Sequence, residues 1–153
     1  MIKKYRIAFI TMFILLFIGC NLCFAHFLSD NPGRYYKVED SANIITEKYV
    51  DLRSFKSKNY APPFYQISAD MYNVDYRYKI IGKLVADFYY NYDEQKIIMI
   101  LTGPDIYSFN GQLLSTDSYV TKPMDVPPSS VAHAVANLGF YTFYRMFFSK
   151  ELN

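Results

Sequence analysis

Tryptophan is absent from this 153-residue chain, and cysteine and histidine occur only twice each. Both cysteines, Cys20 and Cys23, lie within the first 23 residues, so the rest of the chain has no disulfide and no thiol nucleophile. A zinc site needs several histidine or cysteine ligands, and the chain contains neither an acidic calcium-binding loop nor a glycine-rich phosphate loop. The sequence therefore predicts no metal site and no bound cofactor.

The shortage of histidine also weakens the case for an enzyme. His133 lies in the first turn of an expected helix, where the base of a catalytic triad would need a carboxylate and a nucleophile to converge on it. No pattern in the linear sequence identifies either partner. We therefore expect a packed or partly exposed helix histidine, and no catalytic residue.

The first 25 residues have the composition of a bacterial secretion signal. Three basic residues among the first six precede an apolar run, residues 7–18, in which Thr11 is the only polar side chain. Cys23 and Ala25 then supply the small side chains that a signal peptidase accepts before it cuts between Ala25 and His26. We expect residues 1–25 to be a signal peptide and the protein to be exported as a secreted, periplasmic or cell-surface protein.

Two other interpretations of this segment stay open. Residues 16–20 resemble a lipoprotein processing box, in which Cys20 would be acylated and would become the mature N-terminus of an envelope lipoprotein with a structural role. The uncharged run of residues 7–29 also approaches the roughly 20 residues that a membrane-spanning anchor needs. In each case the membrane is contacted only through the signal, anchor or lipid.

Charge excludes one class of partner. Cleavage after Ala25 removes three of the sixteen basic residues and none of the fourteen acidic ones, which leaves the mature chain with a formal charge of −1. A nearly neutral domain has no electrostatic reason to bind nucleic acid. The remaining length is typical of one domain with a single core, which we expect over residues 34–153 after a polar tether, residues 26–33.

Alternating and β-branched segments predict a sheet. The clearest alternation covers residues 80–92, where one face is apolar and the other carries Lys83, Asp87 and Asn91. Residues 96–102 are apolar on both faces, as in a central strand covered on both sides. The other expected strands are 34–38, 44–52, 64–76, 106–109 and 112–119, whereas two prolines and a polar run predict a loop at 54–63.

One helix is expected at the C-terminal end. Three prolines interrupt residues 120–128, and Ser129 or Ser130 then provides an N-cap for a helix from Val131 to about Lys150. The predicted fold class is α+β, an antiparallel meander of about six or seven strands with one C-terminal helix packed on it.

Four short motifs occur in order along the chain. They are Tyr35-Tyr36-Lys37-Val38, the stretch from Tyr49 to Phe55, the hairpin from Tyr107 to Leu114, and the stretch from Val126 to Ala132. In this order they resemble the small exported proteins of the surface-adhesin protein E-like group. The resemblance implies an antiparallel sheet with a helix, a cell-envelope or surface location, and an adhesive role.

The chain also differs from that group. It has no tryptophan near the first strand, no cysteine near Tyr92 and none at the helix end, so the resemblance implies no stabilising disulfide here.

Tyrosine is the one abundant residue type that suggests binding, with sixteen in the chain. Exposed tyrosines form contact surfaces at low entropic cost, but cross-strand tyrosine pairs also stabilise sheets, and the sequence leaves both roles open. The candidate contact residues are Phe55, Lys56, Lys58, Tyr60, Tyr89, Tyr141, Tyr144 and Phe148. The outer face of the aromatic C-terminal helix is a further candidate, for a homodimer, a partner or a membrane surface.

The sequence thus predicts a non-catalytic, adhesin-like binding module that contacts an unidentified protein or glycan at the cell envelope. The alternative is a periplasmic carrier, in which Phe88, Met99 and Phe143 line a cavity for a small apolar ligand between sheet and helix.

Overall fold

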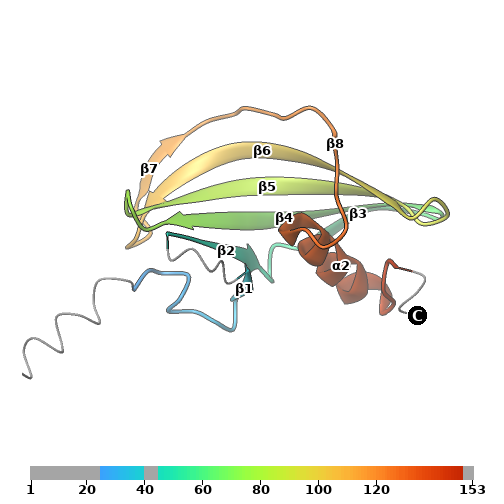
Figure 1. The fold of residues 1–153 in the computed structure, drawn as a ribbon, viewed down its shortest axis with the longest axis horizontal. Coiled ribbons are helices and arrows are strands. Elements are labelled where there is room, and N and C mark those ends of the chain that lie inside the picture. Colours follow the sequence, from blue (N-terminus) through green and yellow to red (C-terminus); the bar gives the residue numbers. More distant parts are fainter. Residues whose placement is uncertain (1–24, 40–44, 150–153) are drawn as a thin grey trace, which may run out of the picture.

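The computed structural model describes residues 25–39 and 45–149, so the segment expected as a signal peptide, with Cys20, lies outside the described residues except for Ala25. The described residues form an eight-stranded antiparallel sheet and one helix, which confirms the predicted α+β class (Figure 1). The strands are β1 (Tyr35–Glu39), β2 (Thr46–Asp51), β3 (Lys56–Ala61), β4 (Phe64–Asp75), β5 (Ile80–Asn91), β6 (Lys96–Ser108), β7 (Leu113–Thr116) and β8 (Met124–Asp125). The helix is α2 (Val131–Tyr144).

The strands form a meander in the order β1-β2-β4-β5-β6-β7. Strand β3 also pairs with β4, opposite residues 64–68, whereas β2 pairs with residues 71–75 of the same strand. Both strands therefore share one edge of β4, and the chain passes from β2 to β3 through a turn beside the middle of β4. On the other side, the segment between β7 and β8 runs along β6 (Figure 1).

Two strand predictions are wrong. The expected loop at 54–63 contains strand β3, and its two prolines lie in the turn that leads into β4. The two strands expected at 96–102 and 106–109 form the single strand β6, which continues through Gly103 and Pro104. Gly103 has a φ of 120°, which suits glycine, and the carbonyl oxygen of Pro104 accepts the N–H of Asp117 at 2.9 Å.

The helix begins as predicted and ends early. The Ser130 hydroxyl accepts the N–H of His133 at 3.1 Å, which is the geometry of an N-cap. The helix ends at Tyr144 because Arg145 adopts a left-handed conformation and donates its N–H to the carbonyl oxygen of Tyr141. The helix expected to reach about Lys150 is therefore shorter than predicted.

Two hydrophobic clusters lie on opposite faces of the sheet. Ile67 and Ala69 of β4 pack in the first cluster, under α2, whereas Tyr72 and Val74 of the same strand pack in the second. Since successive side chains of a strand point to opposite faces, odd-numbered positions of β4 face α2 and even-numbered positions face away from it. One face of residues 96–102 in β6 therefore packs against the first cluster, on the side of the sheet where the helix lies.

The segment expected as a polar tether covers the second cluster. Leu28 is 0% exposed and His26 is 2% exposed, so the segment expected as a polar tether packs against the sheet at these two side chains. The segment lies toward the end of the sheet away from α2 (Figure 1). Among the described residues, no helix or strand covers the middle of the face opposite α2, around Ser68, Asp70, Val85 and Asp87, and we call it the open face.

Candidate functional site

The strand register places a group of charged side chains on the open face. Ser68 and Asp70 of β4 lie directly opposite Asp87 and Val85 of β5, and Lys56 of β3 lies directly opposite Ser68. Directly paired residues point to the same face. Positions separated by up to 31 residues in the sequence thereby meet on one surface.

A hollow of about 420 Å³ lies in this surface. Nine of its ten lining residues are polar or charged, and we call it the basic hollow because basic side chains outnumber acidic ones. Its lining consists of Arg34, Asp51, Arg53, Ser54, Lys56, Lys58, Ser68, Asp70, Lys83 and Val85.

The turn between β2 and β3 forms one wall of the basic hollow. Asp51, 2% exposed, accepts the Arg53 N–H through Oδ1 at 2.9 Å, and its Oδ2 accepts Arg34 Nε at 2.9 Å and Nη2 at 2.7 Å. The Ser54 hydroxyl donates to the Asp51 carbonyl oxygen at 2.6 Å and accepts the Asp70 N–H at 2.8 Å. These bonds fix the turn against β4.

Two of the basic side chains have acidic partners on β4 and β5. Lys58 Nζ lies 2.6 Å from Asp87 Oδ1, and Lys83 Nζ lies 2.9 Å from Asp70 Oδ2. Burial lowers the pKa of Lys83, but the hydrogen bond and the charge of Asp70 outweigh it and hold the pKa above its ordinary value. Lys83 is therefore cationic at neutral pH.

Arg53 and Lys56 are different. Within residues 25–39 and 45–149, neither side chain has a hydrogen bond or an ion pair, and both residues are exposed. The lining of the basic hollow holds five basic side chains and two carboxylates, so its positive charge is only partly neutralised. A concave surface with an excess of one sign attracts ligands of the other sign.

The predicted contact residues divide into three groups. Lys56 and Lys58 line the basic hollow, and Tyr89, 38% exposed, lies on the same face because it is paired with Gln66. Tyr60, Tyr141 and Tyr144 lie on the helix side: the Tyr60 ring contacts that of Tyr144, and Tyr141 stacks on Phe147. The structure does not bring the open-face group and the helix-side group onto one surface. The third group is buried.

Phe55 and Phe148 are buried in the first cluster, at 9% and 2% exposure, so the prediction that they belong to a contact surface is wrong. A Cβ atom on Gly139 would lie 2.9 Å from Phe55 Cε1, which shows how closely that ring packs against α2.

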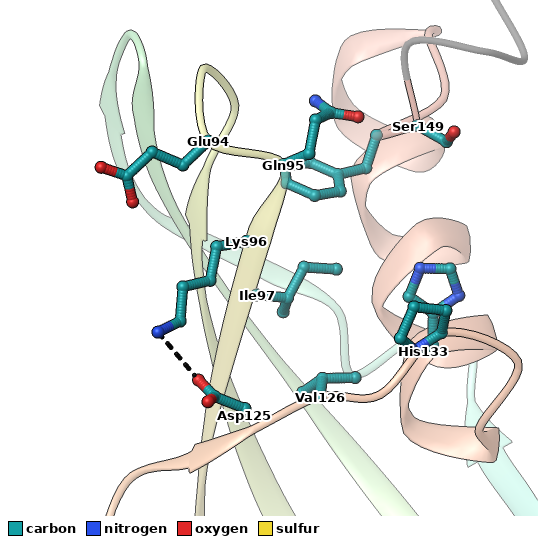
Figure 2. Close-up of a pocket in the computed structure, with 10 residues that line it drawn as sticks. Glu94, Gln95, Lys96, Ile97, Asp125, Val126, His133 and Ser149 are labelled. Atoms are coloured by element: carbon teal, nitrogen blue, oxygen red, sulfur yellow. Dashed lines mark ion pairs between the residues drawn. The ribbon is translucent and has the colours of Figure 1, made fainter.

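A second hollow, of about 680 Å³, surrounds His133 (Figure 2). Its floor is apolar, with Ile97, Val126 and Phe148. Lys96 points toward Asp125 and forms an ion pair with it at 3.1 Å, whereas His133 lies on the helix side (Figure 2). The polar contact of the His133 ring is with Asn137 Nδ2 at 3.2 Å, which is not the carboxylate that a catalytic histidine needs.

A third hollow, of about 320 Å³, lies between β1 and α2 and is mainly apolar. Tyr36 and Phe147 line it and are 53% and 42% exposed. The homodimer expected through the helix stays a prediction. In the carrier alternative Phe88, Met99 and Phe143 share a cavity, but Phe88 is 0% exposed, Phe143 is 38% exposed, and none of these three residues lines any of the three hollows.

The tyrosines among the described residues differ in burial, and their part in binding stays a prediction. Tyr35, Tyr49, Tyr72 and Tyr90 are buried in the two clusters, where they stabilise the sheet. Others are exposed, among them Tyr36, Tyr60, Tyr78, Tyr89 and Tyr119.

Sequence reasoning identified Lys56 and Lys58 but not Arg34 or Lys83 as members of the site. For Lys83, the sequence offers one signal, which is a polar position in an alternating strand. Its place beside Asp70 depends on the pairing of β4 with β5.

In the part of the chain that the structure describes, no helix has the length and hydrophobicity to span a membrane, and no three side chains of the metal-binding types gather into a group. Comparisons of the chain with protein-family models, with curated proteins and with solved structures find no match.

Proposed function

We propose that this protein is an exported, non-catalytic binding module that contacts its partner at the cell envelope through the open face of its sheet. The N-terminal basic and apolar segment supports export. The resemblance to the surface-adhesin protein E-like group points to the same location and to an adhesive role.

The observation that carries the proposal is the contrast between the two faces of the sheet. The helix α2 covers one face, and Tyr90 and Phe140 fill the space between the helix and the sheet. The other face keeps a hollow in which Arg53 and Lys56, both exposed, have no partner within the described residues. Exposed charged and aromatic side chains on a rigid sheet are suited to contact with a partner.

The alternatives have less support. A carrier needs an enclosed apolar cavity, and the largest hollow among the three is rimmed by Lys96 and Asp125. A lipoprotein acylated at Cys20 is compatible with the binding module, since a lipid anchor would only fix the same domain to the membrane.

Export is tested by the intact mass and N-terminal peptide of the protein recovered from its own host. An unmodified N-terminus at His26 supports cleavage after Ala25 and a soluble exported domain. An acylated Cys20 at the N-terminus supports a tethered module at the envelope. An intact chain found in the cytoplasm would contradict the proposal.

Binding through the open face is tested with envelope fragments from the same host. We expect the purified protein to sediment with the fragments and the double variant Lys56→Glu, Lys58→Glu to remain in solution. The matched control is Lys79→Glu, Lys122→Glu, which changes the charge by the same amount at exposed residues that lie outside the strands and do not line the basic hollow. Equal sedimentation of the two variants would contradict a contact through the open face.

A further inference from the structure

We propose that the basic hollow binds phosphate or sulfate ester groups, and that its ligand carries more than one of them. This inference rests on the proposed function, because it gives the chemistry of the partner that the open face contacts.

The first argument is the balance of charge. Asp51 is buried, and its carboxylate accepts two hydrogen bonds from Arg34 and one from the Arg53 N–H, so its charge is paired with Arg34. Asp70 and Asp87 each engage one lysine. The guanidinium of Arg53 and the ammonium of Lys56 are left without an anionic partner among the described residues, although both border the same hollow.

The second argument is preorganisation. Arg53 follows directly after the buried Asp51, and its own N–H is bonded to that carboxylate. Lys56 is held in β3 by pairing with Ser68. The backbone that carries both cations is thus fixed before any ligand binds, so a ligand orders only two side chains.

The third argument is the match between these donors and an ester oxyanion. Arginine presents a planar set of N–H donors and lysine three donors around a point charge, and tetrahedral phosphate and sulfate groups offer several oxygens to such donors. A carboxylate offers only two oxygens, and Asp51, Asp70 and Asp87 already supply that chemistry from within the protein. The unpaired cations therefore favour a group with more acceptor oxygens.

The spacing of the cations indicates more than one group. Lys56 pairs with Ser68 and Lys83 with Tyr72, so their backbones are about 10 Å apart across β4 and about 13 Å apart along it. Cations carried by backbone positions this far apart present donors over an area wider than a single tetrahedral anion. A chain with repeated anionic groups, or a ligand with two of them, contacts both sides of the hollow.

The test is isothermal titration of the purified protein with defined probes. The probes are a heparin-derived sulfated hexasaccharide, inorganic pyrophosphate, and vesicles of phosphatidylglycerol compared with vesicles of phosphatidylcholine. We expect binding of at least one multivalent anionic probe that weakens as salt is added. The double variant Arg53→Gln, Lys56→Gln should lower its affinity about tenfold or more, since charge-assisted hydrogen bonds are lost.

Two comparisons make the result decisive. Lys56→Arg keeps the charge and should retain binding, whereas the control Lys96→Gln, Lys122→Gln should leave affinity unchanged. Binding of the hexasaccharide alone supports the proposal with a sugar-linked ester as source, and binding of anionic vesicles alone supports it with a lipid headgroup as source. Binding of none of the probes, or equal losses in the Arg53–Lys56 variant and the control, would overturn it. Envelope binding through the open face together with that negative result would leave the proposed function intact and reject only the ester-binding site.

Discussion

The phenol of Tyr90 donates a hydrogen bond to the carbonyl oxygen of Ala136, with 2.9 Å between the two oxygens. Tyr90 lies in β5 and Ala136 in α2, and both are buried in the first cluster. Burial raises the pKa of Tyr90 well above its ordinary value, so the phenol keeps its proton and remains a donor. This contact holds the helix against one face of the sheet.

Tyr90→Phe should lower the free energy of unfolding by about 1 to 2 kcal/mol, because the Ala136 carbonyl oxygen keeps its helical role but loses a buried donor. The measurement is urea-induced unfolding of the purified protein. Tyr89→Phe is the matched control, since the neighbouring side chain is 38% exposed on the open face. Equal effects of the two substitutions would show that the Tyr90 hydrogen bond does not hold the helix.

Gly139→Ala should also destabilise the protein, although alanine is the better helix former. The new methyl group would lie 2.9 Å from Phe55 Cε1 and 3.3 Å from Ile67 Cγ2, and the buried side chains have little room to move. We expect a loss of about 1 to 3 kcal/mol in the free energy of unfolding, measured by the same urea titration. Gly33→Ala, which meets open space, is the control, and a more stable Gly139→Ala protein would contradict the close contact between helix and sheet.

The sequence predicts a strand correctly where one face of that strand is covered and the other is more exposed. In β5, Ala86, Phe88 and Tyr90 are buried in the first cluster while Asp87 and Tyr89 between them are less so, and this produces the alternation visible in the sequence. The Ser130 cap and the turn at Asn110 and Gly111 were predictable for local reasons, since a hydroxyl cap and a positive φ depend only on nearby residues.

Strand β3 was missed because all six of its residues are exposed. Its backbone pairs with β4, but its side chains carry no hydrophobic alternation, so the sequence resembles a loop. The early end of α2 was missed for a different reason: aromatic residues continue after Tyr144, and Phe148 packs in the first cluster without being helical.

The basic hollow could be predicted only in part. Lys56 and Lys58 are close together in the sequence and in the structure, whereas Arg34 and Lys83 reach the hollow through the pairing of separate strands. No local pattern encodes that register. The burial of His26 and Leu28 was equally hidden, because both belong to a polar, turn-rich segment in which only a few side chains, among them Phe27 and Leu28, pack in the second cluster.

A hydrogen-bonded group links this N-terminal segment to the sheet. Glu47 accepts hydrogen bonds from Lys37 Nζ at 2.8 Å, Tyr49 Oη at 2.7 Å and Tyr76 Oη at 2.8 Å, and the Tyr76 hydroxyl also lies 3.2 Å from His26 Nε2. Burial acts to raise the pKa of Glu47, but the three hydrogen bonds and the charge of Lys37 outweigh it and lower the pKa to about 2.

Glu47 should therefore make the protein sensitive to acid. Because its pKa is lower in the folded protein than in the unfolded chain, its stabilising contribution is complete above pH 4.5 and is lost as the pH falls toward 2. In Glu47→Gln we expect a decrease of about 2 kcal/mol in the free energy of unfolding at pH 7, allowing for the partial exposure of the carboxylate, and a weaker pH dependence below 4.5. The measurement is urea unfolding from pH 7 to pH 2, with Glu94→Gln in an exposed turn as the control. An unchanged pH dependence in Glu47→Gln would contradict the role of this carboxylate.

The most direct test of the open face as the contact surface is lysine footprinting of the protein bound to envelope fragments. Acetylation with a water-soluble reagent followed by peptide mass spectrometry reports how accessible each lysine is in the free and bound protein. We predict that Lys56 and Lys58, which line the basic hollow, become protected on binding, while Lys79 and Lys122, which lie outside the strands, are modified to the same extent in both states. Protection of Lys79 or Lys122 without protection of Lys56 and Lys58 would contradict a contact through the open face.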